Sequence, residues 1–125
     1  MYLVDTNIFL EILLKQDKSK DCKDFLDKNM DQINITDFSL HSIGVILFRQ
    51  KEDELFSKFL DDTLPKVHLT ALPKDQYQLL TANRQKLKLD FDDSYQYSVC
   101  KHYGFKLVTM DQDFKKVKDV EPLFL

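Results

Sequence analysis

The sequence is poor in several residue types, and each shortage excludes a class of protein. Only 2 glycines and 3 prolines occur in 125 residues, which excludes a collagen-like repeat and a disordered Gly/Pro-rich chain. The 2 cysteines, Cys22 and Cys100, lack zinc-site spacing and lie in helical patterns, so we expect buried free thiols. No apolar run approaches the roughly 20 residues that span a bilayer, and no signal-peptide pattern opens the chain. We therefore expect a cytoplasmic protein without a membrane partner.

Positive charge is also in short supply relative to negative charge. The chain has 18 Lys and Arg residues against 21 Asp and Glu residues, a formal net charge of −3. Proteins that hold nucleic acid by bulk electrostatics usually have a basic excess, so this mode of binding is disfavoured. An acidic site filled with divalent cations is still compatible with nucleic acid, because the cations invert the local field.

The residues that are present fit a single domain covering residues 1–125. Hydrophobic residues make up 43% of the chain and charged residues 31%, as in ordinary globular proteins. A chain of this length buries a core without disulfides or a structural metal.

Short apolar segments alternate with amphipathic ones along the chain. We expect strands at residues 1–4, 32–36, 66–72, 105–110 and, at a sheet edge, 121–125. We expect helices at residues 6–16, 18–29, 37–50, 51–64, 73–88 and 91–104, the third one capped by Asp37 or Ser39. Strands joined by helical crossovers predict an α/β fold, a three-layer α/β/α sandwich with a central, mostly parallel sheet of four to five strands.

Two of the predicted strands are followed by an acidic residue. Asp5 ends the apolar run of the first strand, and Asp111 follows the strand at 105–110. Ligand sites of such sheets form outside the carboxyl ends of the strands. The two carboxylates are therefore expected to meet at one edge of the sheet.

More acidic residues are close to these two in the sequence. Asp90, Asp92 and Asp93 gather at the start of the last predicted helix, and Asp113 follows Asp111 by two positions. Carboxylates held together repel one another and raise each other's pKa unless a cation neutralises them. Hard divalent ions prefer carboxylate oxygens, so Mg²⁺ or Mn²⁺ is the expected cofactor. Such a site suits phosphodiester hydrolysis.

Three segments together resemble the PIN-domain family of metal-dependent ribonucleases, which includes toxins of the VapC type. They are "VDTN" around Asp5, "FDDS" around Asp93 and "LVTMDQDF" around Asp111, and their order spans nearly the whole chain. The resemblance implies that Asp5, Asp93 and Asp111 are the catalytic metal ligands. It further implies RNA as substrate, a homodimer and an antitoxin protein as partner.

The resemblance also implies supporting residues around the metal. Thr6, Asn7 and Thr109 would hold the carboxylates or position water and phosphate, and Asp113 would be a supporting carboxylate. Family members usually carry a Glu on the helix after the second strand, where this chain has Ser42. One hypothesis is that Asp37, a few residues earlier, substitutes for that Glu; the simpler interpretation, which we favour, is that Asp37 only caps the helix.

A basic segment precedes the acidic one at residues 90–93. Arg84, Lys86 and Lys88 are the expected RNA-binding residues, because cations beside the metal site would follow the phosphate backbone.

Simpler interpretations exist for each acidic residue. Asp5 would only cap the following helix, Asp111 and Asp113 would be turn residues, and the acidic residues at 90–93 would only complement a helix dipole.

Other functions compete with the nuclease. One alternative is a catalytically impaired PIN-like module that binds RNA or protein. Another is a phosphatase with Asp5 as nucleophile, which is disfavoured because such enzymes carry a second Asp where Asn7 stands.

Overall fold

A five-stranded sheet forms the centre of the molecule, and all neighbouring strands in it are parallel. The computed structural model describes residues 1–125. The strands are β1 (Tyr2–Val4), β2 (Ile33–Thr36), β3 (His68–Thr70), β4 (Lys106–Thr109) and β5 (Leu123–Phe124). They lie in the order β3-β2-β1-β4-β5, so the strand order reverses between β1 and β4. The predicted parallel sheet and its edge strand near the C-terminus are confirmed.

Six α-helices connect and cover the strands. They are α1 (Thr6–Leu13), α2 (Ser19–Asn29), α3 (Asp37–Arg49), α4 (Asp53–Asp62), α5 (Gln78–Leu87) and α6 (Phe91–Tyr103). Short 3₁₀ turns complete the chain, among them η4 (Gln112–Lys116) and η5 (Lys118–Val120). Not one helix combines the length and the apolar composition that crossing a bilayer requires.

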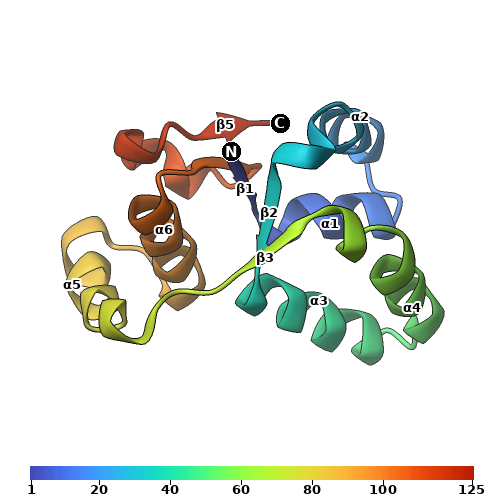
Figure 1. The fold of residues 1–125 in the computed structure, drawn as a ribbon, viewed down its shortest axis with the longest axis horizontal. Helices are drawn as coiled ribbons and strands as arrows, with labels where there is room; N and C mark the ends of the chain where they lie inside the picture. The colour runs from blue at the N-terminus through green and yellow to red at the C-terminus, as the bar shows by residue number, and fades with distance from the viewer.

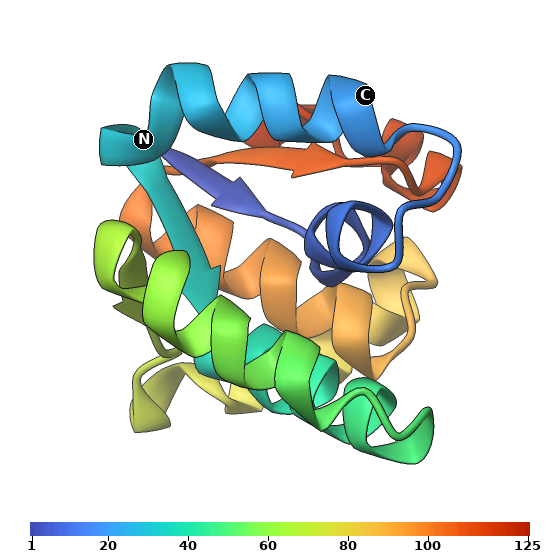
Figure 2. The same cartoon turned by 90° about the vertical axis from the view of Figure 1, so that its right-hand side faces the viewer.

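The helices lie on both faces of the sheet, as the predicted α/β/α sandwich requires. Helices α1 to α4 lie on one side of the strands and α5 and α6 on the other (Figure 1). Figure 2 is viewed from the side of α1 to α4, so that α5 and α6 lie behind the strands. Successive strand residues face opposite cores: Val4 packs with α1 to α4, whereas Leu3 packs with α6 and the C-terminal turns.

Lysines in the left-handed conformation lie just after the ends of three helices. Lys15 (φ 52°) follows α1, Lys51 (φ 58°) separates α3 from α4, and Lys88 (φ 54°) caps α5. Glycine usually fills such positions, and here only Gly104 after α6 does so (φ 73°). Helix α1 ends three residues before the predicted end, whereas the ends of α3 and α5 lie within one residue of the prediction; α5 begins five residues later than predicted.

Helix α3 is capped by a residue that the sequence analysis did not select. Thr36, the last residue of β2, is the N-cap, and its hydroxyl accepts a hydrogen bond from the Ser39 amide at 2.9 Å. The prediction of Asp37 or Ser39 as the cap is therefore wrong, since these residues lie one and three positions after Thr36. The Thr36 hydroxyl also donates to the Ser39 hydroxyl at 3.0 Å, which in turn accepts from Thr6 at 2.8 Å. This cap thereby ties β2, α3 and α1 together.

We predict that Thr36→Ala lowers the free energy of unfolding by about 1–2 kcal/mol, because the α3 cap and a buried hydroxyl contact are lost. Thr36→Ser keeps the hydroxyl and is the matched control, with a smaller loss. Urea denaturation followed by circular dichroism measures both. A Thr36→Ala protein with the midpoint of the wild type would show that Thr36 does not cap α3.

Candidate functional site

The site lies where the strand order reverses, at the carboxyl ends of β1 and β4. The Asp5 amide donates to the carbonyl oxygen of Val108 at 2.9 Å, so β1 stays joined to β4 up to this point. Asp5 and Asp111 line one cleft just beyond it. Open α/β sheets form their ligand sites at such a reversal.

The Asp5 carboxylate is fixed by side chains from two other elements. Gln96 of α6 donates its amide to Asp5 Oδ1 at 2.8 Å, and the Thr109 hydroxyl donates to Asp5 Oδ2 at 2.7 Å. Asp5 occupies the N-cap position of α1, yet its side chain makes no capping hydrogen bond. Burial raises the pKa of Asp5 above its usual value, and these two hydrogen bonds only partly offset the rise. The interpretation of Asp5 as a simple helix cap is therefore wrong.

Three other carboxylates come together beside Asp5. Asp93, Asp111 and Asp113 each offer one carboxylate oxygen, and these three oxygen atoms lie within 4.8 Å of one another. Asp111 has a turn role as well, because its Oδ1 accepts from the Asp113 amide at 2.9 Å. Asp90 caps α6 by accepting from the Asp93 amide at 2.9 Å, which confirms the capping interpretation for that residue.

Asp93 has the most perturbed carboxyl group of the cluster. Burial raises its pKa to about 7, with further contributions from the negative charges of Asp90, Asp111, Asp5 and Asp113. A cation placed among these groups would remove that repulsion.

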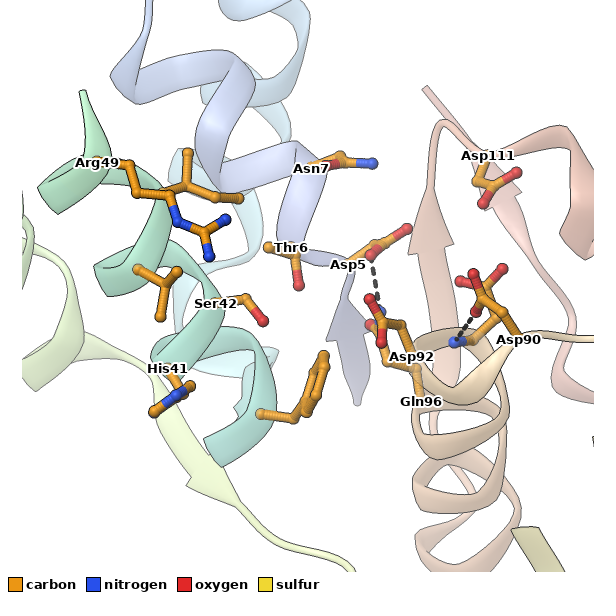
Figure 3. A pocket seen from close by; sticks show the side chains of 14 residues that line it. Asp5, Thr6, Asn7, His41, Ser42, Arg49, Asp90, Asp92, Gln96 and Asp111 are labelled. Carbon is orange, nitrogen blue, oxygen red and sulfur yellow. Dashed lines mark hydrogen bonds between the residues drawn. The ribbon is translucent and has the colours of Figure 1, made fainter. Parts of the chain in front are cut away.

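The cleft beside the cluster has a volume of about 450 Å³ and two walls of different character (Figure 3). The ends of β1 and β4 and the start of α6 supply its acidic residues, which are Asp5, Asp90, Asp92, Asp93 and Asp111. Helix α3 supplies the opposite wall, which consists of Phe38, His41, Ser42, Val45, Ile46 and Arg49. This second wall has no carboxylate.

The residues expected to support the metal ligands have different positions. Thr109 is fully buried beneath Asp5, and its hydroxyl accepts from the Asp111 amide at 2.9 Å while it donates to Asp5. Thr6 lines the cleft but donates to Ser39, and Asn7 is exposed at the edge of the cleft. Ser42, at the position of the expected Glu, also lines the cleft.

Asp37 is not brought together with the other acidic residues. Its Oδ1 accepts from the Tyr95 hydroxyl at 2.6 Å and from the Phe38 amide at 2.8 Å. It lines a neighbouring, mostly apolar cavity that it shares with Gly44 and Phe56. The structure therefore gives no support to Asp37 as a replacement for the missing Glu, because its carboxylate is bound by Tyr95 of α6 and does not line the cleft of the acidic cluster.

The expected RNA-binding residues do not form one group. Arg84 lines a separate small cavity between α5 and α6, and Lys86 is exposed on α5. Lys88 lies against η4, where the Lys116 ammonium donates to the Lys88 carbonyl oxygen at 3.1 Å. Lys116 follows Asp113 by one 3₁₀ turn. A basic edge consisting of Lys88 and Lys116 thus flanks the acidic cluster, and the sequence analysis did not connect these two segments.

Two further residues of the cleft were missed. Gln96 is 2% exposed, holds Asp5 and leaves its own Oε1 without a hydrogen-bond partner. Its position one helical turn after Asp93 was a usable signal, since both residues then share a face of α6. Arg49 is the second such residue, and its spacing from Ser42 was the usable signal, since both residues share a face of α3.

The donor set fits a hard divalent cation. Carboxylate oxygens are the ligands that Mg²⁺ and Mn²⁺ prefer, and the three clustered carboxylates have no cationic side chain within ion-pair distance. Neither cysteine contributes, because both are buried free thiols, as expected. Asp93, Asp111 and Asp113 are the residues that could hold the ion.

Comparison with known proteins gives a consistent result. Residues 2–120 match the model of the PIN domain family. The solved toxin-antitoxin complex from Klebsiella pneumoniae has a similar fold, with a TM-score of 0.78 and 18% identity over 98% of this chain and 96% of that chain. The solved structure of VapBC2 from Rickettsia felis, bound to a DNA fragment from its promoter, gives a TM-score of 0.80 and 19% identity over 98% of this chain and 97% of that chain.

FitAcB from Neisseria gonorrhoeae gives a TM-score of 0.74 and 14% identity over 100% of this chain and 96% of that chain. At these identities, the likeness shows a shared fold. Comparison with curated proteins finds no significant match.

We predict that Asp93→Asn stabilises the metal-free protein at high pH. The folded pKa of Asp93, about 7, exceeds the unfolded value of about 4, so the wild type loses stability as pH rises between these values. The variant lacks this loss, and its advantage should grow from pH 4 to pH 8. The midpoints of urea denaturation in EDTA, compared at each pH for the variant and the wild type, measure this advantage.

The exposed Asp61→Asn of α4 is the matched control and should follow the wild type at every pH. Adding Mg²⁺ should raise the midpoint of the wild type and leave that of Asp93→Asn unchanged. Parallel pH curves for the wild type and Asp93→Asn would contradict the perturbed carboxyl group.

Proposed function

The chain belongs to the PIN-domain family, and on this premise we propose that it is a nuclease that hydrolyses RNA phosphodiester bonds with Mg²⁺ or Mn²⁺. One observation carries the proposal: the carboxylates of Asp93, Asp111 and Asp113 converge at the sheet reversal without a cationic partner. A bound divalent ion there supplies the positive charge that lowers the pKa of water and offsets charge on phosphate oxygens.

The residues of the cleft have distinct proposed roles. Asp93, Asp111 and Asp113 hold the cation, and Asp5 adds a carboxylate whose orientation Gln96 and Thr109 fix. Such fixed hydrogen bonds keep a ligand oriented when the ion leaves or exchanges. Asn7, exposed at the edge, is available to hydrogen-bond an incoming phosphate or sugar.

The second candidate function is a PIN-like module without catalysis that binds RNA or protein. The observation in its favour is Ser42, which provides a hydroxyl where the family usually places the carboxylate of a Glu. With one carboxylate fewer, the site would bind a cation more weakly. Metal-dependent turnover separates the two candidates.

We also propose an antitoxin protein as a partner. The solved structures with this fold include toxin-antitoxin complexes, and their chains match this one over almost the full length. The homodimer expected from the family resemblance stays a prediction.

We predict RNA cleavage by the purified protein with Mn²⁺ or Mg²⁺ and none with EDTA. Asp93→Asn and Asp111→Asn should each lower the rate at least about 100-fold, because each removes a ligand of the ion that offsets the transition-state charge. Cleavage of a mixed, labelled RNA pool followed on denaturing gels measures this.

Asp61→Asn, purified in parallel, controls for contaminating ribonuclease and should retain full activity. Cleavage that survives both Asp93→Asn and Asp111→Asn would contradict the assigned site. No cleavage by any form, together with no metal binding by calorimetry, would favour the second candidate function.

We predict that the basic edge of Lys88 and Lys116 contributes to RNA binding. The double variant Lys88→Gln/Lys116→Gln should reduce the slope of log Kd against log salt by about 1.4, because two phosphate contacts are lost. Lys20→Gln/Lys23→Gln on α2 is the matched control, since both of its lysines are already paired with aspartates. Equal slopes for the two double variants would remove the basic edge from the RNA-binding surface.

A further inference from the structure

Arg49 is the one residue with a permanent positive charge among those lining the acidic cleft. It ends α3, on the wall opposite the carboxylates. Figure 3 shows its guanidinium turned into the cleft, on the side of Ser42 and Thr6. No carboxylate oxygen lies within 4.0 Å of it, and none of its N–H groups donates a hydrogen bond within the protein.

The helical repeat of α3 explains why Arg49 enters the cleft. Ser42, Val45, Ile46 and Arg49 follow the spacing that places residues on one face of a helix, and all of them line the cleft. Arg49 therefore lies two turns along the same stripe as Ser42. Helix α3 thus places Arg49, which is exposed to solvent, on the wall opposite the carboxylates.

A free guanidinium facing five carboxylates calls for an explanation. A cation in the last turn of a helix is favourable for the helix dipole, but any orientation of the side chain gives that benefit. The carboxylates attract Arg49, yet the cleft keeps the two walls too far apart for an ion pair. The space between the two walls has the proposed cation-binding carboxylates on one side and the five free N–H groups of Arg49 on the other.

We propose that Arg49 binds a backbone phosphate of the RNA strand in this space. The inference rests on the proposed RNA-binding role of the cleft. The planar guanidinium matches two phosphate oxygens with parallel hydrogen bonds, which a lysine ammonium does not. A phosphate in this space would contact Arg49 on one side and, on the other, a divalent ion held by the clustered carboxylates. Arg49 thereby becomes a substrate-binding residue of the cleft, and α3 becomes the wall that holds the strand.

The test measures RNA binding rather than cleavage. The probe is a fluorescent single-stranded oligouridylate of about 12 nucleotides, titrated by anisotropy in Ca²⁺ at several salt concentrations; Ca²⁺ takes the same oxygen ligands as Mg²⁺. The variants are Arg49→Gln, Arg49→Lys and, as control, Lys51→Gln, which removes a charge from the same helix end outside the cleft. Cleavage of the probe with Mn²⁺ is measured in parallel.

Arg49→Gln should weaken binding about ten- to hundredfold, as expected for loss of a bidentate charged contact, and lower the salt slope by about 0.7. Arg49→Lys keeps the positive charge, so it should have the same slope of log Kd against log salt as the wild type. It should recover only part of the affinity for the probe. Lys51→Gln should stay within about twofold of the wild type.

Two results would overturn the inference. One is an Arg49→Gln protein that matches Lys51→Gln in affinity and slope. The other is a wild type that does not bind the probe, because a phosphate contact requires no particular base sequence. Binding of the probe that depends on Arg49, in a protein that cleaves neither the probe nor the mixed RNA pool, would support this phosphate contact and contradict the nuclease function, so the two proposals fail separately.

Discussion

The hydrogen bonds to the Asp5 carboxylate organise this molecule. They join three elements that are far apart in sequence: Asp5 ends β1, Thr109 ends β4, and Gln96 belongs to α6. Because the strand order reverses between β1 and β4, no other pair of adjacent strands would leave the same opening above the sheet. The same contacts bring the start of α6, and with it Asp93, close to Asp111. Fold and site thus depend on one buried, hydrogen-bonded carboxylate.

The cost of this arrangement is electrostatic. Burial deprives the carboxylates of Asp5 and Asp93 of water and raises the pKa of both, and repulsion from neighbouring carboxylates raises these pKa values further. Natural proteins keep such destabilising clusters at functional sites, where a cation or a substrate offsets them. The opposite wall on α3 is neutral except for Arg49 and the titratable His41. The proposed binding of an anionic strand between a cation and the Arg49 guanidinium rests on this asymmetry of the cleft.

The sequence predicted the layers, the parallel sheet and the meeting of Asp5 with Asp111, because strand-ending acidic residues and alternating apolar segments are local signals. It did not predict the relations that depend on packing. Asp37 was a hypothetical ligand of the metal, yet the Tyr95 hydroxyl holds it elsewhere. Lys88 and Lys116 adjoin only because η4 folds back onto the end of α5. The helical repeat places Arg49 on the same face of α3 as Ser42, but the packing that turns this face toward the carboxylates is not a local signal. The end of α1 was missed because Lys15, and not the usual glycine, adopts the left-handed conformation after it.

The location of the cation is the central claim, and one measurement tests it most directly. Anomalous diffraction from crystals soaked in Mn²⁺ would locate the ion without relying on activity. The account predicts a peak in contact with carboxylate oxygens of Asp93, Asp111 and Asp113, beside Asp5 and across the cleft from Arg49. A peak elsewhere, for example at Asp37, or no peak at millimolar Mn²⁺, would contradict it.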